Sequence, residues 1–324
     1  MKIIFQLDFL KREHIYDSCW NYFIKKSTNK SVYYLCEYLD IICPNWCAYT
    51  VKYNSHCIAI MPINISYKYG IKYSLKPYLA QFLGPIFADK INDETKASVL
   101  ELLSKQLGQQ FNFFDHCLHP SLSSVVSKIN FRKFIFEKFH SYELNLNDSD
   151  ENIYKNFSTS VTNHIRKAQR KGLRCIDSRC PLWLAQSLVE QNIISKEQSK
   201  TFLQLAQHII SQNQGFILYS QSQEGITCAG GLFIINFNKV TFIGSASNPD
   251  YKKYGGNSML IWEAIKKCRG YSHINTFDFE GSMLPNIEKY FVGFRPQKIF
   301  YYRMQLQPIA FIKLARHFIK YLKT

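Results

Sequence analysis

The chain has 324 residues, of which 46% are hydrophobic and 15% aromatic, and its 40 Lys and Arg outnumber its 24 Asp and Glu. This composition excludes an intrinsically disordered protein, and the length predicts two compact domains. The formal net charge of +16 favours nucleic acid, phosphorylated cofactors or anionic lipid as partners, unless it only keeps the surface soluble. No segment is apolar enough for a spanning helix, and Asp8 interrupts any signal-like start, so the sequence predicts a cytoplasmic protein.

The ten cysteines are scattered along the chain. The shortest spacings are Cys43 to Cys47 and Cys175 to Cys180, and neither is accompanied by a histidine pair at zinc-ligand spacing. We therefore expect reduced thiols and no metal site.

The second half of the chain predicts a strand and two helices, then a meander of three antiparallel strands, and then a helix, a strand, a helix and a strand. The three strands of the meander are separated by short polar turns, and the helix that follows them has one apolar face. The expected elements are strand 174–177, helices 182–191 and 198–211, strands 215–221, 226–237 and 239–247, helix 258–269, strand 275–280, helix 284–294 and strand 298–306.

The first half repeats this order of elements without any visible repeat of residues. Its expected elements are strand 2–7, helices 16–25 and 33–40, strands 47–53 and 56–66, helix 93–107, strand 110–115, helix 121–128 and strand 132–139. We interpret the chain as a tandem duplication with domains 1–146 and 147–324. The last helix, 311–324, is basic and amphipathic, and it is expected to pack on the first domain or to touch an anionic membrane.

The loop that precedes the helix near residue 258 has the features of a phosphate site. Paired glycines allow close approach of a ligand, and the exposed amides and dipole of the helix start attract an anion. A turn before a core helix would explain the same glycines. The candidate residues for binding a cofactor are Lys252, Lys253, Tyr254, Gly255, Gly256, Asn257 and Ser258.

A second motif, FDFEGS, ends the strand near residue 280. Alternation in an extended strand would place Asp278 and Glu280 on one face, where carboxylates can orient an amine and accept its proton. Glu280 is the preferred base and Ser282 a candidate substrate contact. The alternative is a structural turn and helix cap.

A third segment, 160–174, is a helix with a narrow apolar stripe and many cations. Arg166, Lys167 and Lys171 are candidate contacts for an anionic substrate. A solvated helix face is the simpler alternative.

Together these three segments, with YFVGF at 290–294, resemble the Fem-like and BioF2-like acetyltransferase-domain proteins of the GNAT (acyl-CoA N-acyltransferase) superfamily. MPINISYKYGIKY, at 61–73, resembles their N-terminal part. The resemblance implies a mixed α/β (α+β) fold with two tandem GNAT-like domains. It also implies an N-acyltransferase that uses acyl-CoA or aminoacyl-tRNA as the donor, with the donor carbonyl along strand 241–246, beside Ser245.

The resemblance leaves the substrate open. The implied acceptor is an amine, and a cell-envelope or nucleotide-linked precursor is the candidate that carries it. Fem enzymes carry a lysine where this chain has Phe291, which argues against their bridge-forming chemistry, and tRNA is therefore a less favoured donor. A non-catalytic basic module that binds RNA or an envelope precursor is the alternative from another class.

The first domain is expected to lack a donor site. Its corresponding segment, 83–95, carries Asp89, Asp93 and Glu94 where a phosphate would need amides and cations.

Overall fold

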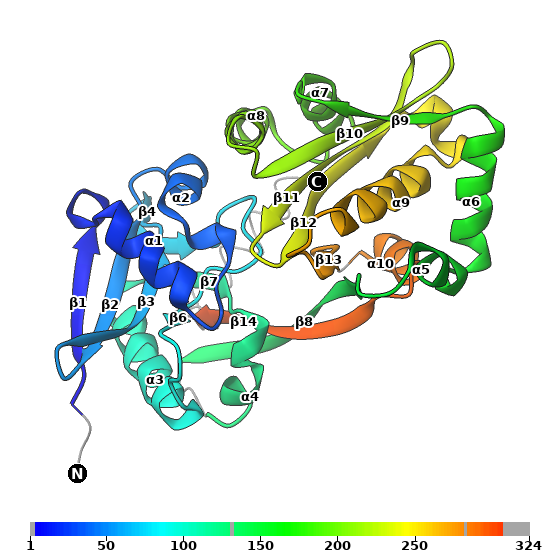
Figure 1. Cartoon of the computed structure of the whole chain (residues 1–324). Coiled ribbons are helices and arrows are strands. Elements are labelled where there is room, and N and C mark those ends of the chain that lie inside the picture. Colours follow the sequence, from blue (N-terminus) through cyan, green and yellow to red (C-terminus); the bar gives the residue numbers. More distant parts are fainter. Residues whose placement is uncertain (1–3, 130–132, 282–283, 307–324) are drawn as a thin grey trace. The chain divides into compact units, whose positions relative to one another are not determined.

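The computed structural model describes residues 4–129, 133–281 and 284–306 (Figure 1). The described chain divides into two compact units: unit 1 runs to Phe139 and resumes at Phe300, and unit 2 is His140–Ile299. The sequence placed a single boundary at residues 146 and 147. In the structure, strands β8 (Phe134–Asn145) and β14 (Gln297–Leu306) each contain residues of both units.

Unit 2 is built on a mixed sheet with the strand order β8-β13-β12-β11-β10-β9. The meander strands pair antiparallel, whereas β12 pairs in parallel with β13. These strands are β9 (Arg174–Ser178), β10 (Gly215–Gln221), β11 (Thr227–Asn236), β12 (Lys239–Ser247) and β13 (Thr276–Asp278). The meander agrees with the sequence prediction to within a residue or two, but β13 is three residues shorter than expected.

Helices cover both faces of this sheet (Figure 1). On one face, α9 packs its apolar side against α6 and against Phe216, Phe233 and Phe242 of the sheet. On the other face, α7 and α8 approach the strands, with Trp183 against Tyr219 at 5.6 Å between ring centroids. The helices are α5 (Asp150–Asn156), α6 (Thr159–Arg170), α7 (Leu182–Glu190), α8 (Lys196–Ser211), α9 (Gly256–Arg269) and α10 (Pro285–Val292), with a 3-10 turn η4 (Pro249–Tyr254) before α9.

Unit 1 contains two groups of strands. One group has the order β1-β2-β3-β6, and in the other group β5 lies between β4 and β7, and β7 pairs with β14. The strands are β1 (Gln6–Lys11), β2 (Cys47–Tyr53), β3 (His56–Ile63), β4 (Ser66–Lys68), β5 (Ile71–Leu75), β6 (Ile86–Phe87) and β7 (Phe113–Cys117). The α-helices are α1 (Asp17–Lys26), α2 (Cys36–Ile42), α3 (Asp93–Gln110) and α4 (Ser123–Val126), and short 3-10 turns are η1 (Arg12–His14), η2 (Val32–Tyr34) and η3 (Pro120–Leu122).

The two units share one supersecondary pattern. In unit 1, β5 and β7 are parallel and joined through α3, just as β12 and β13 of unit 2 are parallel and joined through α9. Antiparallel partners complete both patterns, since β8 pairs with β13 and β14 pairs with β7. This pairing explains why residues 140–145 belong to unit 2 and residues 300–306 to unit 1. The predicted mixed α/β fold is confirmed.

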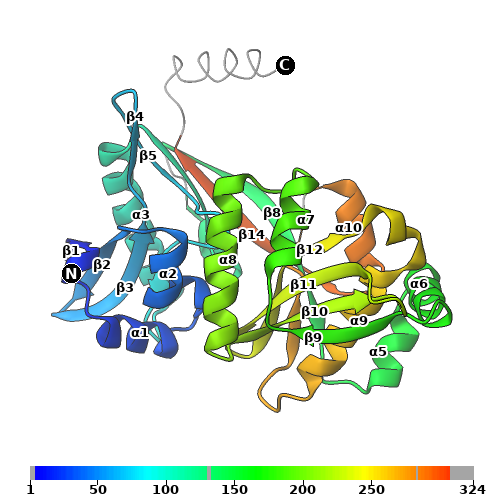
Figure 2. The same ribbon diagram turned by 90° about the horizontal axis from the view of Figure 1, so that it is seen from above.

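Two expected strands of unit 1 differ from the structure. The strand expected over 2–7 is β1, which runs from Gln6 to Lys11 and so ends four residues later than expected. The sequence predicted a continuous strand over 56–66, whereas β3 ends at Ile63 and a separate hairpin of β4 and β5 follows. Proline at position 62 does not end the strand, because β3 continues for one more residue. The hairpin projects from unit 1 (Figure 2).

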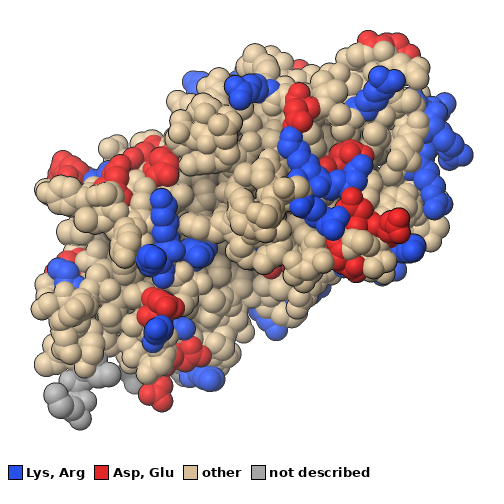
Figure 3. Space-filling view, viewed as in Figure 1, with Lys and Arg blue, Asp and Glu red and all other residues tan. Residues whose placement is uncertain are grey.

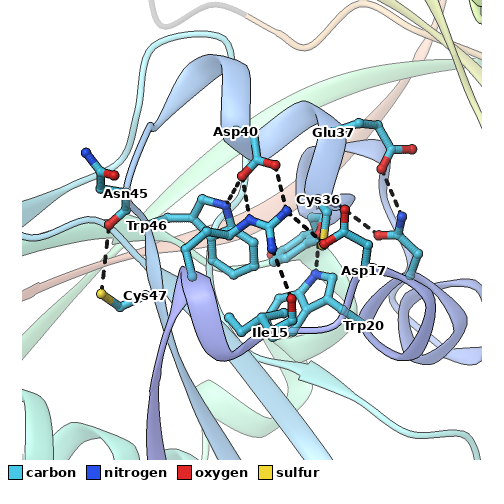
Figure 4. A network of polar contacts seen from close by, with 12 residues as sticks. Ile15, Asp17, Trp20, Cys36, Glu37, Asp40, Asn45, Trp46 and Cys47 are labelled. Carbon is cyan, nitrogen blue, oxygen red and sulfur yellow. Dashed lines mark hydrogen bonds and ion pairs between the residues drawn. The ribbon is translucent and has the colours of Figure 1, made fainter.

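An ion-pair network fastens the first helices of unit 1 (Figure 4). The Arg12 guanidinium donates to both carboxylate oxygens of Asp40, at 2.6 and 2.8 Å, and pairs with Asp17 at 2.8 Å. Trp46 donates its indole N–H to Asp40 at 2.8 Å, and its ring lies 5.5 Å from the Arg12 guanidinium carbon. The paired Arg12 lowers the pKa of Asp40 even though burial opposes this shift. Through the Arg12 side chain of η1, the network therefore ties α1, α2 and the residue that precedes β2.

Among the described helices, none combines the length and the apolar character that crossing a bilayer requires. All ten cysteines lie within the described residues and are free thiols.

His116 of β7 gives unit 1 a predicted pH dependence. Its ring is fully buried, with Nδ1 2.8 Å from the Leu83 carbonyl and Nε2 2.9 Å from the Ser74 hydroxyl. Burial lowers the pKa of His116 from 6.5 to about 4, so the unfolded chain takes up the proton first as the pH falls. The free energy of unfolding should fall by about 1.4 kcal/mol per pH unit between those two values because of this group.

The prediction is measured by urea unfolding of wild type and His116→Gln at pH 7 and pH 5. Other titrating groups also lower the stability of both proteins as the pH falls. The quantity to compare is therefore the loss of unfolding free energy between pH 7 and pH 5 in each protein. The wild type should lose about 1–2 kcal/mol more than the variant over this interval. Equal losses would show that His116 does not titrate as its burial requires.

Candidate functional site

The site begins where the parallel pair of unit 2 ends. β12 and β13 are paired only from Lys239 opposite Thr276 to Thr241 opposite Asp278. β12 then runs on to Ser247, and its pairing with β11 shifts register so that Ile243 is an extra residue. Such a bulge bends and twists the strand that carries it. The end of β12 therefore lies beyond its partner β13 and is available to line a cavity.

A cavity of about 850 Å³ lies at this end of β12. A cavity of this size is typical of sites for cofactors and small molecules. All its lining residues belong to unit 2. They come from the end of β12 (Ser245, Ala246, Ser247), from η4 (Pro249, Tyr251, Lys252, Lys253), from the start of α9 (Gly255, Gly256, Asn257, Ser258), from α10 (Asn286, Ile287, Tyr290) and from His164, Gln191 and Cys228.

The first turn of α9 presents hydrogen-bonding groups to this cavity. No side chain of the described residues caps the helix, and the first amides of a helix have no intrahelical acceptor. The Asn257 side chain donates to the Tyr290 hydroxyl at 3.3 Å, and its Oδ1 is buried without a hydrogen-bond partner among the described residues. The start of α9 thus combines free N–H donors, which suit an anion, with one unsatisfied carbonyl acceptor.

Cations border the cavity along η4 and the end of α6. Lys252 and Lys253 line it directly. The ammonium groups of Lys253 and Lys171 lie 5.5 and 5.7 Å from the centre of the Tyr254 ring, so the structure brings Lys171 to the predicted loop. Arg166 and Lys167 are exposed on α6 and are not among the lining residues. Figure 3 shows the cluster of basic side chains at the α6 edge of unit 2.

The two glycines have a packing role that the sequence analysis did not foresee. Gly255 has a φ of 82°, and a Cβ there would lie 2.3 Å from the His164 carbonyl oxygen. A Cβ on Gly256 would lie 3.1 Å from the buried Ser220 hydroxyl. The glycines therefore allow α9 to start close against α6 and β10. This close placement of the backbone leaves the start of α9 open to the cavity.

The two candidate carboxylates do not share one strand face. Asp278 is the last residue of β13, whereas Glu280 lies beyond the strand with a φ of 56°. The Glu280 amide donates to the Asp278 carboxylate at 2.8 Å, and the Ser141 hydroxyl donates to the same oxygen at 3.3 Å. The predicted extended alternation over FDFEGS is therefore wrong at Glu280. Neither carboxylate is among the cavity-lining residues, and Ser282 lies outside the described residues.

Asp278 is an ionisable group in an apolar place. Its exposed fraction is 5%, and Phe277 and Phe279 beside it are fully buried. Burial raises the pKa of Asp278 from 3.8 to about 6, with a further contribution from Glu143, although Lys239 opposes the shift. Such a pKa suits a group that accepts and releases a proton near neutral pH.

The sequence analysis missed Tyr290 as a polar group of the cavity. Its hydroxyl lies 3.1 Å from the Ser258 hydroxyl, and burial raises its pKa well above the ordinary value. The helical spacing of Tyr290 from Asn286 and Ile287 could have indicated a shared face. The neighbouring Phe291 packs against Phe279 in the core, with 5.1 Å between the ring centroids.

The corresponding helix of unit 1 has an occupied start. The Asn92 side chain caps α3 by accepting from the Thr95 amide at 2.8 Å. Asp93 and Glu94 lie in the first turn, where their charge already offsets the helix dipole. The cap occupies the Thr95 amide, and the two carboxylates make the potential at this helix start unfavourable for an anionic ligand.

Asp278 yields a prediction about stability. Between its unfolded and folded pKa values the folded protein binds the additional proton, so ionisation of Asp278 costs stability as the pH rises from about 4 to about 6. Asp278→Asn keeps an oxygen for both hydrogen bonds and has no charge to bury. The variant should gain about 2–3 kcal/mol relative to wild type between pH 4 and pH 7.5, measured by urea unfolding. A constant difference between the two proteins would contradict the raised pKa.

Gly255→Ala tests the close start of α9. The left-handed backbone alone costs about 1–2 kcal/mol with a side chain. The clash with the His164 carbonyl should bring the total loss of stability to about 3 kcal/mol or more. Gly225→Ala is the matched control, because Gly225 has a φ of 79° and no atom within 4 Å of its Cβ position. Equal losses in thermal unfolding would show that α9 does not need this contact with α6.

Comparisons with known proteins agree with this architecture. Residues 186–283, which include the last turn of α7 and the elements through β13, match the FemAB family model. No curated protein sequence matches the chain. Among solved structures, FemX superposes with a TM-score of 0.66 at 11% identity, covering 91% of this chain and 96% of FemX. A conserved protein of unknown function from Bacteroides thetaiotaomicron superposes with a TM-score of 0.52 at 11% identity, covering 94% of this chain and all of that protein.

The likeness to solved structures establishes the fold, and the FemAB match adds the family pattern over the segment that builds the cavity. Together they support an acyltransferase enzyme, of the acyl- or aminoacyl-transferring kind. Over residues 186–283 the chain is similar to the FemAB family, and its fold is that of FemX, as its sequence motifs predicted.

Proposed function

We propose that this protein is an N-acyltransferase that transfers an acyl group from a phosphate-bearing donor to an amine. The observation that carries the proposal is the uncapped start of α9, which opens into the cavity beside Lys252 and Lys253. Free backbone amides, a helix dipole and two ammonium groups form an environment that favours a phosphate or pyrophosphate. Acyl-CoA is the donor that fits best, since it carries both a pyrophosphate and an acyl arm.

The acyl arm of the donor would lie along the end of β12. Beyond Thr241 this strand has lost its parallel partner, so the backbone near Ser245 is available to an amide-containing arm. The unsatisfied Oδ1 of Asn257 would accept a hydrogen bond from an N–H group of the donor. Arg166, Lys167 and Lys171 would act at longer range on an anionic donor or acceptor.

In the proposed reaction, the neutral amine attacks the donor carbonyl directly, and the C–N bond forms as the bond to the leaving group breaks. The proton lost by the amine passes to a carboxylate, for which we assign Glu280, with Asp278 holding the Glu280 amide in place. The leaving thiolate of CoA takes up a proton from water, while the buried Tyr290 hydroxyl stays protonated and is available as a hydrogen-bond donor. Positioning of the two reactants supplies much of the rate in such a mechanism.

Aminoacyl-tRNA is the second candidate donor. Its terminal adenosine and phosphates could use Tyr254 between Lys171 and Lys253, since bases stack on aromatic rings and phosphates pair with cations. We propose the cytoplasm as the location and a cell-envelope or nucleotide-linked amine as the acceptor. Contact of the last helix, 311–324, with a membrane concerns residues outside those described.

Donor binding distinguishes these possibilities. CoA or an acyl-CoA should raise the melting temperature in a saturable way, and Lys252→Gln with Lys253→Gln should weaken the apparent affinity about tenfold. Lys266→Gln is the matched control, because Lys266 pairs with Glu263 at 2.7 Å elsewhere on α9. Stabilisation by aminoacyl-tRNA but not by CoA would identify the tRNA as the donor. If neither CoA nor aminoacyl-tRNA stabilises the protein, the transferase proposal is wrong.

A further inference from the structure

The β4–β5 hairpin of unit 1 exposes aromatic and apolar side chains together with lysines. Tyr67 and Tyr69 have exposed fractions of 68% and 90%, and Ile71 and Leu75 are also exposed. The cross-strand register places Tyr67 opposite Lys72, and Lys68 opposite Ile71. Each face of the hairpin therefore pairs a lysine with an aromatic or apolar residue, since opposed residues share a face.

The tip of the hairpin holds a tyrosine in an unfavourable backbone conformation. Tyr69 and Gly70 form a two-residue turn with φ values of 50° and 75°. A turn of this kind favours Asn or Asp at the first position, because a bulky residue there is strained. The most exposed tyrosine among these residues thus occupies a position that local folding alone would give to asparagine. A contact of the Tyr69 ring with a partner outside the chain would explain why a tyrosine occupies this position.

In the stretch of sequence that contains the hairpin, all charged residues are positively charged. No Asp or Glu occurs between Asp40 and Asp89, and the hairpin itself contributes Lys68 and Lys72. The Lys68 ammonium lies 5.5 Å from the centre of the Tyr69 ring. A basic, aromatic tip of this kind is complementary to an anionic surface.

We propose that the β4–β5 hairpin docks on an anionic lipid surface. The rings of Tyr67 and Tyr69 would lie at the level of the headgroups, where amphipathic rings are favoured, with Lys68 and Lys72 next to lipid phosphates. The exposed side chains of Ile71 and Leu75 favour lipid over nucleic acid as the partner. Exposed aliphatic side chains gain from contact with acyl chains, whereas they offer nothing to a phosphate backbone or to a base edge. This peripheral contact is independent of the proposed donor site in unit 2.

The test is co-sedimentation of the full chain with vesicles of phosphatidylcholine, alone or mixed with phosphatidylglycerol. The wild type should pellet only with the anionic vesicles, and added salt should weaken the binding. Tyr69→Asn suits the backbone of the turn, so the variant should fold, yet its affinity for the vesicles should fall about fivefold. Lys68→Gln with Lys72→Gln should lower the affinity by a larger factor.

Tyr16→Asn is the matched control, because Tyr16 is also a tyrosine of unit 1 and has an exposed fraction of 79%. It should bind the anionic vesicles as the wild type does. Equal binding by Tyr69→Asn and Tyr16→Asn, or no binding of the wild type, would overturn the proposal. It would also be overturned if Tyr69→Asn weakened binding to single-stranded RNA while leaving vesicle binding unchanged.

Discussion

The short parallel pairing of β12 with β13 is the constraint on which the site depends. Only Lys239 to Thr241 of β12 find a partner in β13 before the strands stop pairing, and the bulge at Ile243 then turns the rest of β12. A parallel pair needs a crossover connection, which here is η4 and α9. The crossover must start at the end of β12, so the amino end of α9 lies next to the part of that strand that pairs with β11 but no longer with β13. The cavity results from this arrangement.

Packing and polarity act together at the start of α9. Gly255 and Gly256 bring the helix against α6 and β10 at distances that a side chain would not permit. No described side chain caps the helix, and its first residues line the cavity. The corresponding helix of unit 1, α3, is instead capped by the side chain of Asn92. The same supersecondary pattern thus gives an open helix end in one unit and a closed one in the other.

The two candidate carboxylates carry a cost in stability. Asp278 is buried and has a raised pKa, and Glu280 has a backbone conformation that is uncommon for its residue type. Unfavourable features of this sort gather at functional sites, where geometry matters more than stability. The oxygen that holds the Glu280 amide belongs to Asp278, so the burial of one carboxylate fixes the backbone of the other.

The sequence by itself determined the order of most helices and strands, the mixed α/β class, the meander and the loop before α9. These features depend on hydrophobic period and turn residues, which are local along the chain. Tertiary structure alone decided that β8 and β14 complete the sheets, that residues 66–75 form a hairpin, and that Tyr290 joins Asn257 at the cavity. The tertiary structure also decided that Glu280 lies beyond the end of β13, with a positive φ. Strand partners and cavity walls come from residues far apart in sequence, and no local pattern records which of them meet.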